Sequence, residues 1–314
     1  MIEKDRPMIF AAPGTEGFAR SLIGSLGAED GKADIRSFPD GETYIRVLSN
    51  VDGRLVVIVC SLFRPDEKLV PLYFLARSLR EFGARHICLA APYLSYMRQD
   101  KMFQPGEAIT SEYFANLICS FADSIITVDA HLHRRDSLSE IYDIPGENLH
   151  AAVEIAEWIS QNVRLPVLIG PDSESEQWVS EVASNARAPF TVLDKTRRGD
   201  HDVSVSVPNL ENYRDRTPVL VDDIISTART MIETVGHLRT LGMKTPICIG
   251  VHAVFAGDAY RELIGAGVER VVTCNTVPHE TNRIDLSDLF VDFIKGQADT
   301  LRKNQNTCGS STGA

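Results

Sequence analysis

Hydrophobic positions along the chain gather in short continuous runs that alternate with longer amphipathic stretches. The short runs are rich in Val and Ile, and they predict strands at residues 8–12, 55–60, 86–91, 124–128, 167–170, 190–194, 219–221, 247–251 and 271–274. Apolar residues three and four apart predict helices at 67–82, 111–121, 151–160, 176–183 and 228–241. Continuous apolar strands separated by helices are typical of parallel sheets covered on both faces. The predicted fold class is therefore α/β, with mainly parallel sheets flanked by helices.

The alternation of strands and helices runs twice, with a seam near residues 144–149. A length of 314 residues also favours two domains, at roughly 150 residues each. We predict a first domain at 1–147, on which 286–303 packs back, and a second at 148–285. The polar, alternating segment 31–50 predicts a β flap in the first domain, and the low-complexity tail 304–314 is expected to be disordered.

Charge and cysteine usage exclude several classes of protein. Lys and Arg number 32 against 43 Asp and Glu, a net charge of −11 that argues against a general nucleic-acid binder. No apolar run reaches the ~18 residues of a membrane span, and residues 1–7 do not resemble a signal peptide. The six cysteines are scattered without metal-ligand spacing, which predicts free thiols and no zinc site. We expect a cytoplasmic protein that makes no contact with membranes.

The sequence VLVDDIISTART at residues 219–230 has the clearest chemical content. An apolar strand ends in Asp222 and Asp223, and a hydroxyl-rich turn then enters an amphipathic helix. The N–H groups at a helix N-terminus bind phosphate, and carboxylates accept hydrogen bonds from sugar hydroxyls, so the pattern predicts a sugar-phosphate site. The alternative is an ordinary helix cap provided by Asp223 or Ser226.

This stretch resembles the phosphoribosyl-diphosphate-binding motif shared by phosphoribosyltransferases and ribose-phosphate diphosphokinases (PRPP synthetases). Five further segments resemble diphosphokinase motifs in the family's order, namely FPDGETYIR (38–46), PYLSYMRQDK (92–101), VDAH (128–131), GPD (170–172) and DKTR (194–197). The resemblance covers about residues 8–300. It implies two phosphoribosyltransferase-like domains and transfer of diphosphate from Mg-ATP to the C1 hydroxyl of ribose 5-phosphate, which releases AMP.

The resemblance also implies roles for particular residues. Those implied to bind ATP are Phe38, Asp40 and Glu42 on a flap that reaches over a neighbouring subunit, together with Arg98, Gln99 and His131. His131 and Asp172 are implied to hold Mg²⁺. The site shared between subunits implies a homodimer or a larger homo-oligomer. Without the resemblance, the flap is a hydrophilic hairpin tip, Arg98 a solvated arginine and His131 a structural histidine.

The remaining implied roles concern the sugar and the transferring group. Lys195 and Arg197 are implied to be catalytic, stabilising the diphosphate in the transition state; the alternative is a solvated basic turn. The residues implied to bind ribose 5-phosphate are Asp222, Asp223, Ser226, Thr227, Ala228, Arg229 and Thr230.

The chain departs from the family pattern at three places, and two alternative functions stay open. Ser226 replaces a usual Asp, Ala228 and Arg229 replace usual glycines, and the Ser-Glu-Ser sequence at 173–175 replaces a glycine pair. Glu174 and Arg229 motivate the hypothesis of a catalytically weak paralogue that regulates an active synthetase. A phosphoribosyltransferase would use the two carboxylates equally well, but it leaves the flap and the Arg98 motif unexplained.

Overall fold

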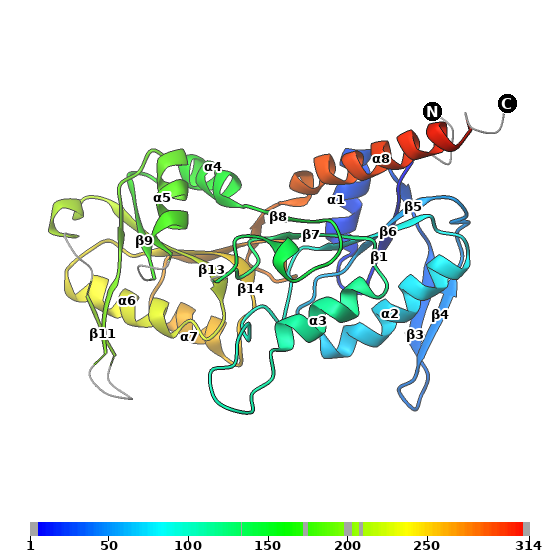
Figure 1. Cartoon of the computed structure of the whole chain (residues 1–314). Coiled ribbons are helices and arrows are strands. Elements are labelled where there is room, and N and C mark those ends of the chain that lie inside the picture. Colours follow the sequence, from blue (N-terminus) through cyan, green and yellow to red (C-terminus); the bar gives the residue numbers. More distant parts are fainter. Residues whose placement is uncertain (1–5, 133, 172–174, 198–202, 207–209, 310–314) are drawn as a thin grey trace. The chain divides into compact units, whose positions relative to one another are not determined.

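The computed structural model describes the backbone of residues 6–132, 134–171, 175–197, 203–206 and 210–309 (Figure 1). The side chains at 194–197, 203–206, 211 and 304–309 also lie outside the description. The chain divides into two compact units, of which unit 1 comprises Met1–Leu149 with Ser287–Ala314, and unit 2 comprises His150–Leu286.

Unit 1 is built on a six-stranded parallel sheet in the order β2-β1-β5-β6-β7-β8. The strands in that order are Glu29–Asp30, Met8–Ala11, Leu55–Val59, His86–Ala91, Ser124–Val128 and Gly146–Leu149. Every residue of β5 and β7 is buried, which explains their uninterrupted apolar sequences. The predicted seam near 144–149 forms the edge strand β8.

Helices cover both faces of this sheet, as the sequence predicted. Helices α1 (Glu16–Leu26) and α8 (Val291–Gly309) lie on one face, and α2 (Asp66–Glu81) and α3 (Thr110–Cys119) on the other (Figure 1). Phe18 of α1 packs edge-to-face on Phe290, just before α8, with ring centroids 5.0 Å apart. Helix α1 was not predicted, because Gly17 and Gly24 lower its helix propensity.

Helix α8 extends further than the sequence predicted. The tail was expected to be disordered from residue 304, but the helical backbone continues to Gly309. Extending an existing helix adds a hydrogen bond for each residue fixed, whereas starting a new helix is unfavourable. A polar sequence that would not nucleate a helix by itself can therefore continue one.

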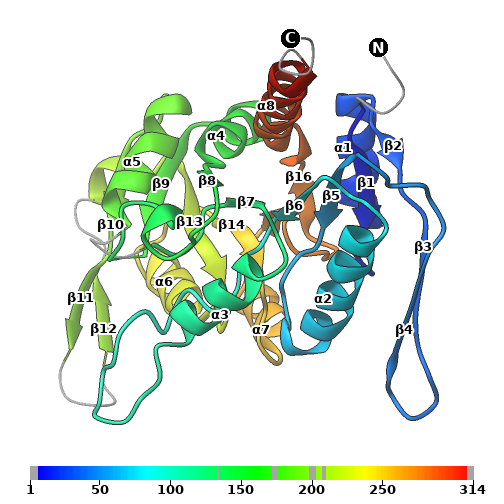
Figure 2. The same cartoon turned by 45° about the vertical axis from the view of Figure 1, so that its right-hand side comes forward.

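The predicted flap is an antiparallel hairpin of β3 (Ala33–Ser37) and β4 (Thr43–Val47). It lies beside α2, and Ile35 and Ile45 pack against the core of unit 1 (Figure 2). The base of the flap is therefore anchored by apolar contacts, while its tip projects beyond α2 in both views.

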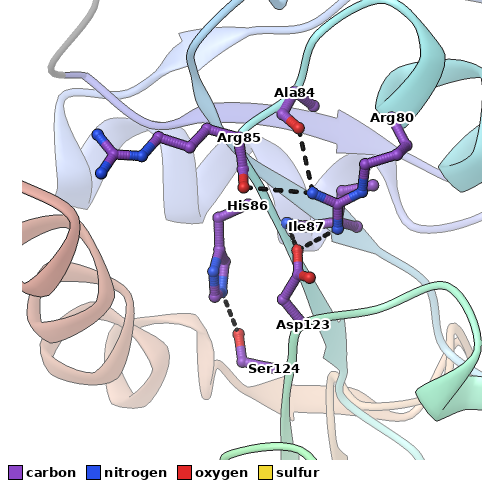
Figure 3. A network of polar contacts seen from close by, with 7 residues as sticks. All are labelled: Arg80, Ala84, Arg85, His86, Ile87, Asp123 and Ser124. Atoms are coloured by element: carbon purple, nitrogen blue, oxygen red, sulfur yellow. Dashed lines mark hydrogen bonds and ion pairs between the residues drawn. The ribbon is translucent and has the colours of Figure 1, made fainter. Parts of the chain in front are cut away.

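A polar network ties α2 to the amino ends of β6 and β7 (Figure 3). The Arg80 guanidinium pairs with Asp123 and donates to the carbonyl oxygens of Ala84 and Arg85, each at 3.2 Å. Asp123 Oδ2 also accepts from the Ile87 N–H at 2.6 Å. This network stabilises the edge of the sheet opposite the carboxyl ends of the strands.

Unit 2 has a second six-stranded parallel sheet in the order β10-β9-β13-β14-β15-β16. The strands in that order are Phe190–Val192, Pro166–Gly170, Thr217–Ile225, Ile247–Ala253, Arg270–Cys274 and Asn282–Ile284. Helices α4 (Ala152–Asn162) and α5 (Glu176–Asn185) cover one face, and α6 (Arg229–Thr240) and α7 (Ala259–Gly265) the other (Figure 1). A separate ribbon of β11 (Asp194–Arg197) and β12 (Val203–Ser206) lies beside α6.

Strand β13 is longer than the predicted strand at 219–221. Asp222 and Asp223 lie inside it rather than after it, because β14 continues the pairing as far as Ile225 and Ala253. Gly250 of β14 leaves room for the Ile225 side chain, because an added Cβ would lie 2.5 Å from Ile225 Cγ1. Tertiary pairing thus extends the strand past two residues of low β propensity.

Two expectations about chemistry and location can be compared with the structure. The five described cysteines are thiols that form no disulfide with one another, as predicted, namely Cys60, Cys88, Cys119, Cys248 and Cys274. Within the described ranges, no helix combines the length and apolar character needed to span a bilayer. The cytoplasmic location stays a prediction.

Candidate active site

The carboxyl edge of the unit 1 sheet carries three of the predicted ATP residues. Arg98 and Gln99 lie in the loop after β6, and His131 lies in the loop after β7. Because β6 and β7 are parallel neighbours, both loops leave the sheet at the same edge. Ligands of doubly wound sheets bind at this edge.

Polar contacts hold these loops in place. Gln99 Oε1 accepts a hydrogen bond from Thr110 Oγ1 at 2.9 Å, which ties the first loop to the start of α3. Asp100 pairs with Arg134 of the second loop at 2.6 Å. Burial alone raises the pKa of Asp100, but the hydrogen bond and charge of Arg134 outweigh it and hold that pKa below its usual range.

Arg134 and Phe103 form a second feature of these loops, which the sequence analysis did not identify. Phe103 is 53% exposed, with the Lys101 ammonium 5.2 Å and the Arg134 guanidinium 5.3 Å from its ring centroid. The Phe103 ring therefore brings two cations together, of which only Lys101 is close to Arg98 in the sequence. The RQDK sequence was the only signal near them, and Arg134 lies outside it.

His131 follows a short constrained segment. Asp129 is buried with φ 37°, an uncommon conformation for a residue with a side chain. Its N–H donates to the Leu149 carbonyl oxygen at 2.8 Å, and the Ala130 N–H donates to Asn148 Oδ1 at 2.8 Å. The neighbouring strand β8 therefore fixes the backbone that leads to the half-buried His131.

The three flap residues do not join this group within unit 1. Phe38 is 41% exposed at the hairpin tip, where the Glu42 N–H donates to Asp40 Oδ1 at 3.2 Å. Gly41, with φ 93°, makes the tight turn. Both views show the tip on the far side of α2 from the loops after β6 and β7 (Figures 1 and 2).

The carboxyl edge of the unit 2 sheet carries the predicted sugar-phosphate residues. Asp222 and Asp223 are half-buried near the end of β13, and the turn 226–228 leads into α6. The loop after β14 supports this turn, because the Phe255 N–H donates to the Ile225 carbonyl at 2.9 Å and the Ala256 N–H donates to the Ser226 carbonyl at 3.0 Å.

The turn itself places a left-handed residue directly before the helix. Ala228 has φ 55° and ψ 8°, and its side chain is buried in the core of unit 2. Arg229, the first residue of α6, and Thr227 are both exposed, whereas Thr230 is half-buried. The first N–H groups of α6 have no carbonyl partner within the helix, so this turn can bind an anion.

An aromatic cluster next to the turn was also missed by the sequence analysis. Phe255 stacks on His279 and Tyr260, with centroid distances of 4.6 and 5.3 Å. His279 Nδ1 accepts from the Thr281 N–H at 3.3 Å. Burial lowers the pKa of His279, and nearby Glu280 opposes the shift only in part. Separate strand ends bring these residues together, so no local sequence pattern reveals the cluster.

Lys195 and Arg197 have backbone positions in β11, paired with Val205 and Val203 of β12. Their backbone is extended, in an antiparallel ribbon of its own, and the strand expected at 190–194 ends earlier, at Val192 of β10. Asp172 and Glu174 lie outside the described residues.

The metal-ligating side chains among the described residues fit a metal ion that arrives already bound to a nucleotide. No three His, Cys, Asp or Glu side chains gather into a metal-binding group in the described part of the chain. Mg²⁺ is commonly held by one or two carboxylates together with substrate phosphates and water, so it does not need such a cage.

Unit 2 also contains a small cavity of about 10 Å³, lined by Pro171, Thr230 and Thr234 among others. This cavity has room for about one water molecule, so it is no substrate site.

Comparisons with known proteins match both units. The family model described as the N-terminal domain of ribose phosphate pyrophosphokinase matches residues 7–121, and the phosphoribosyl transferase domain model matches residues 137–289. The ribose-phosphate pyrophosphokinase of Methanothermobacter thermautotrophicus is 33% identical over 289 residues, which cover 92% of this chain and 100% of that protein. The ribose-phosphate pyrophosphokinase of Methanopyrus kandleri is 33% identical over 278 residues, covering 88% and 94%. The crystal structure of phosphoribosylpyrophosphate synthetase from Mycobacterium smegmatis is similar with a TM-score of 0.81 at 25% identity, covering 94% and 99%.

Proposed function

This chain belongs to the ribose-phosphate pyrophosphokinase family, and we propose that it transfers the diphosphate of Mg-ATP to the C1 hydroxyl of ribose 5-phosphate. The family makes it a diphosphotransferase with two phosphoribosyltransferase-like units. The observation that carries the proposal is the end of β13, where two half-buried carboxylates precede the anion-binding turn of α6.

Unit 2 is proposed to bind ribose 5-phosphate. The first N–H groups of α6, which have no carbonyl partner within the helix, and the hydroxyls of Ser226, Thr227 and Thr230 offer donors for the 5-phosphate. Asp222 and Asp223 offer acceptors for the ribose hydroxyls. Arg229 is exposed, so its guanidinium is available for the phosphate and does not fill the turn.

Unit 1 is proposed to bind ATP. Arg98 provides a fixed positive charge for the triphosphate, Gln99 holds the loop, and His131 lies at the neighbouring strand end. Phe38, Asp40 and Glu42 would contact adenine in another subunit. This arrangement is supported by the position of the flap tip on the far side of α2 from the ATP loops of its own unit. A homodimer or larger homo-oligomer follows from it.

In the proposed reaction, the C1 hydroxyl oxygen attacks the β-phosphorus of ATP. The new bond joins that oxygen to the β-phosphorus, the bond from the β-phosphorus to the bridging oxygen on the α-phosphate breaks, and AMP leaves with that oxygen. The hydroxyl proton passes to solvent. Lys195 and Arg197 stabilise negative charge on the transferring diphosphate, so catalysis is mainly positioning and electrostatics. His131 and Asp172 would hold Mg²⁺, which neutralises phosphate charge when bound.

The test is to incubate the protein with Mg²⁺, ATP and ribose 5-phosphate and to measure AMP and PRPP. We expect both products in equal amounts. Nucleotide formation from PRPP and a free base, without AMP formation, would indicate a phosphoribosyltransferase. Neither activity from the pure chain, with a changed rate when an active synthetase is added, would indicate the regulatory paralogue.

A variant pair tests the catalytic role. Lys195→Ala should lower kcat by about 100-fold or more with little change in KM, because the lost contact acts in the transition state. Lys295→Ala, which removes an exposed lysine from α8, is the matched control and should keep its kcat. If kcat of Lys195→Ala stays within about threefold of the wild type, Lys195 is a solvated surface residue.

A further inference from the structure

We propose that the aromatic cluster of Phe255, Tyr260 and His279 positions the turn 226–228 and thereby determines the affinity for ribose 5-phosphate. Phe255 is a positioning residue, because it acts on the substrate through the turn, and Tyr260 and His279 act through its ring. The inference rests on the proposed function, since it takes the 5-phosphate as the anion that this turn binds. It goes beyond that function because it assigns a role to three residues outside the sequence motifs.

The backbone of the loop after β14 supports the turn directly. The Phe255 N–H donates to the carbonyl oxygen of Ile225, the last residue of β13, at 2.9 Å. The Ala256 N–H donates to the carbonyl oxygen of Ser226, the first residue of the turn, at 3.0 Å. These two acceptors lie where the chain leaves β13 for α6. A shift of the loop would therefore move the N–H groups that bind the anion.

The loop makes these two hydrogen bonds in an uncommon conformation. Phe255 has φ 34°, in the left-handed region that a residue with a side chain rarely adopts. Just before it, the Val254 N–H donates to the His252 carbonyl oxygen at 3.0 Å, which closes a tight bend. A left-handed residue of this kind costs energy and persists only where the surrounding structure holds it. The contacts of the Phe255 side chain therefore help to fix the position of its own N–H group.

Residues from two other segments hold the Phe255 ring. Its centroid lies 4.6 Å from that of His279, after β15, and 5.3 Å from that of Tyr260 in α7. His279 and Tyr260 also contact each other edge-to-face at 4.9 Å. Aromatic rings with centroids about 4.5–7 Å apart attract each other beyond the effect of the area they bury. Phe255 and Tyr260 pack in addition against the core of unit 2, which includes Ala228 of the turn.

Hydrogen bonds connect the His279 ring to the sheet. Its Nδ1 accepts from the Thr281 N–H at 3.3 Å and lies 2.9 Å from Thr281 Oγ1. Thr281 is buried, and its hydroxyl lies 2.7 Å from the hydroxyl of the buried Thr273 in β15. The His279 ring is therefore fixed to β15, and the Phe255 ring stacks on a support that is itself held. The cluster in this way connects β15 to the turn between β13 and α6.

The experiment measures kcat and both KM values of full-length variants in PRPP synthesis. Phe255→Leu keeps apolar bulk but loses two aromatic pairs, so it should raise the KM for ribose 5-phosphate about 10-fold. The KM for ATP and kcat should stay within about twofold of the wild type, since the lost support acts equally on the bound sugar phosphate and on the transition state. A merely structural role would lower the Tm without this selective change in KM.

A conservative variant and a double variant test the role of the rings. Phe255→Tyr keeps the ring and should keep the KM for ribose 5-phosphate. His279→Ala removes the stacking partner and should raise this KM by about 5-fold. Because His279 acts through Phe255, the double variant Phe255→Leu with His279→Ala should be no worse than Phe255→Leu alone.

The matched control removes an aromatic pair from the other unit. Phe18→Leu loses the edge-to-face contact with Phe290, whose centroid lies 5.0 Å away. This variant should lower the Tm and leave the KM for ribose 5-phosphate unchanged. Circular dichroism establishes that each variant is folded.

Calorimetric titration separates this inference from the proposed function. Ribose 5-phosphate is titrated into the full chain with Mg²⁺ and an ATP analogue that has a methylene group in place of the oxygen between the α- and β-phosphorus. Binding to Phe255→Leu about 10-fold weaker than to the wild type supports the positioning role, even if the wild type forms no PRPP and only the proposed function fails. Unchanged binding by Phe255→Leu, additive effects in the double variant, an equal effect of Phe18→Leu, or a wild type that binds no ribose 5-phosphate would overturn the inference.

Discussion

Replacing Ala228 by glycine tests the left-handed turn that starts the phosphate-binding helix. Ala228 has φ 55° directly before α6, and a side chain in this region costs roughly 1–2 kcal/mol relative to a helical conformation. Glycine adopts the same conformation without that cost. The family resemblance places a usual glycine at this position, so the substitution restores the common residue.

Two opposing effects determine the expected result. Ala228 is only 8% exposed, so removal of its methyl group loses about 0.8 kcal/mol of burial. Glycine also gains freedom in the unfolded chain, worth about 0.4–1 kcal/mol. Together these costs nearly equal the relief of backbone strain. We therefore expect the free energy of unfolding of Ala228→Gly to lie within about 0.5 kcal/mol of the wild type.

The control makes the same chemical change in a normal helix of the same unit. Ala156 is 1% exposed within α4, where glycine costs about 1 kcal/mol in helix propensity and about 0.8 kcal/mol in lost burial. Ala156→Gly should therefore lower the free energy of unfolding by about 2 kcal/mol and the Tm by about 4–8 °C. Calorimetric melting of the two variants measures the difference directly.

The functional readout is the KM for ribose 5-phosphate. Because the Ala228 methyl group is buried in the core and not exposed toward the anion-binding N–H groups, Ala228→Gly should leave KM unchanged. Equal destabilisation by Ala228→Gly and Ala156→Gly would refute the argument, since it would mean that no backbone strain is relieved at position 228.

Two further predictions concern polar groups in the two units. In unit 1, Asp123→Asn should cost about 1 kcal/mol of stability, because the lost ion pair with Arg80 is about one third exposed. Asp123→Ala should cost about 3 kcal/mol, because the Ile87 N–H also loses its acceptor; equal Tm values for the two variants would contradict this. In unit 2, burial lowers the pKa of His279 below its ordinary 6.5. As the pH falls, the unfolded chain therefore binds the proton before the folded chain does. The contribution of His279 to the free energy of unfolding should be complete above pH 6.5 and should be lost as the pH falls below that value. Protonation of Nδ1 also removes the acceptor of the Thr281 N–H. Urea denaturation should therefore show that the free energy of unfolding of His279→Gln depends less on pH between about pH 7 and 5 than that of the wild type. An unchanged pH dependence would exclude His279 as its origin.

Local pattern was sufficient for much of this protein. Strands 86–91 and 124–128 were predicted with the bounds later observed, because parallel strands buried on both faces have unbroken apolar sequences. The polar alternation at 31–50 predicted the hairpin of β3 and β4. The motif residues Asp222, Asp223 and Ser226 were found because strand, turn and helix start lie together in sequence.

The sequence alone determined the α/β class, the approximate elements and the chemistry of the loops, since these follow from hydrophobic period and residue type. Other features depended on contacts between distant segments. Only the tertiary structure decided that β13 continues through Asp222 and Asp223, because its neighbour β14 supplies the pairing. It also decided that Asp100 meets Arg134 and that the Ala256 N–H donates to the Ser226 carbonyl, since each contact joins loops from different strand ends. Hydrogen bonds and ion pairs of this kind require two chain segments to be brought together, and no local pattern in either segment contains that information.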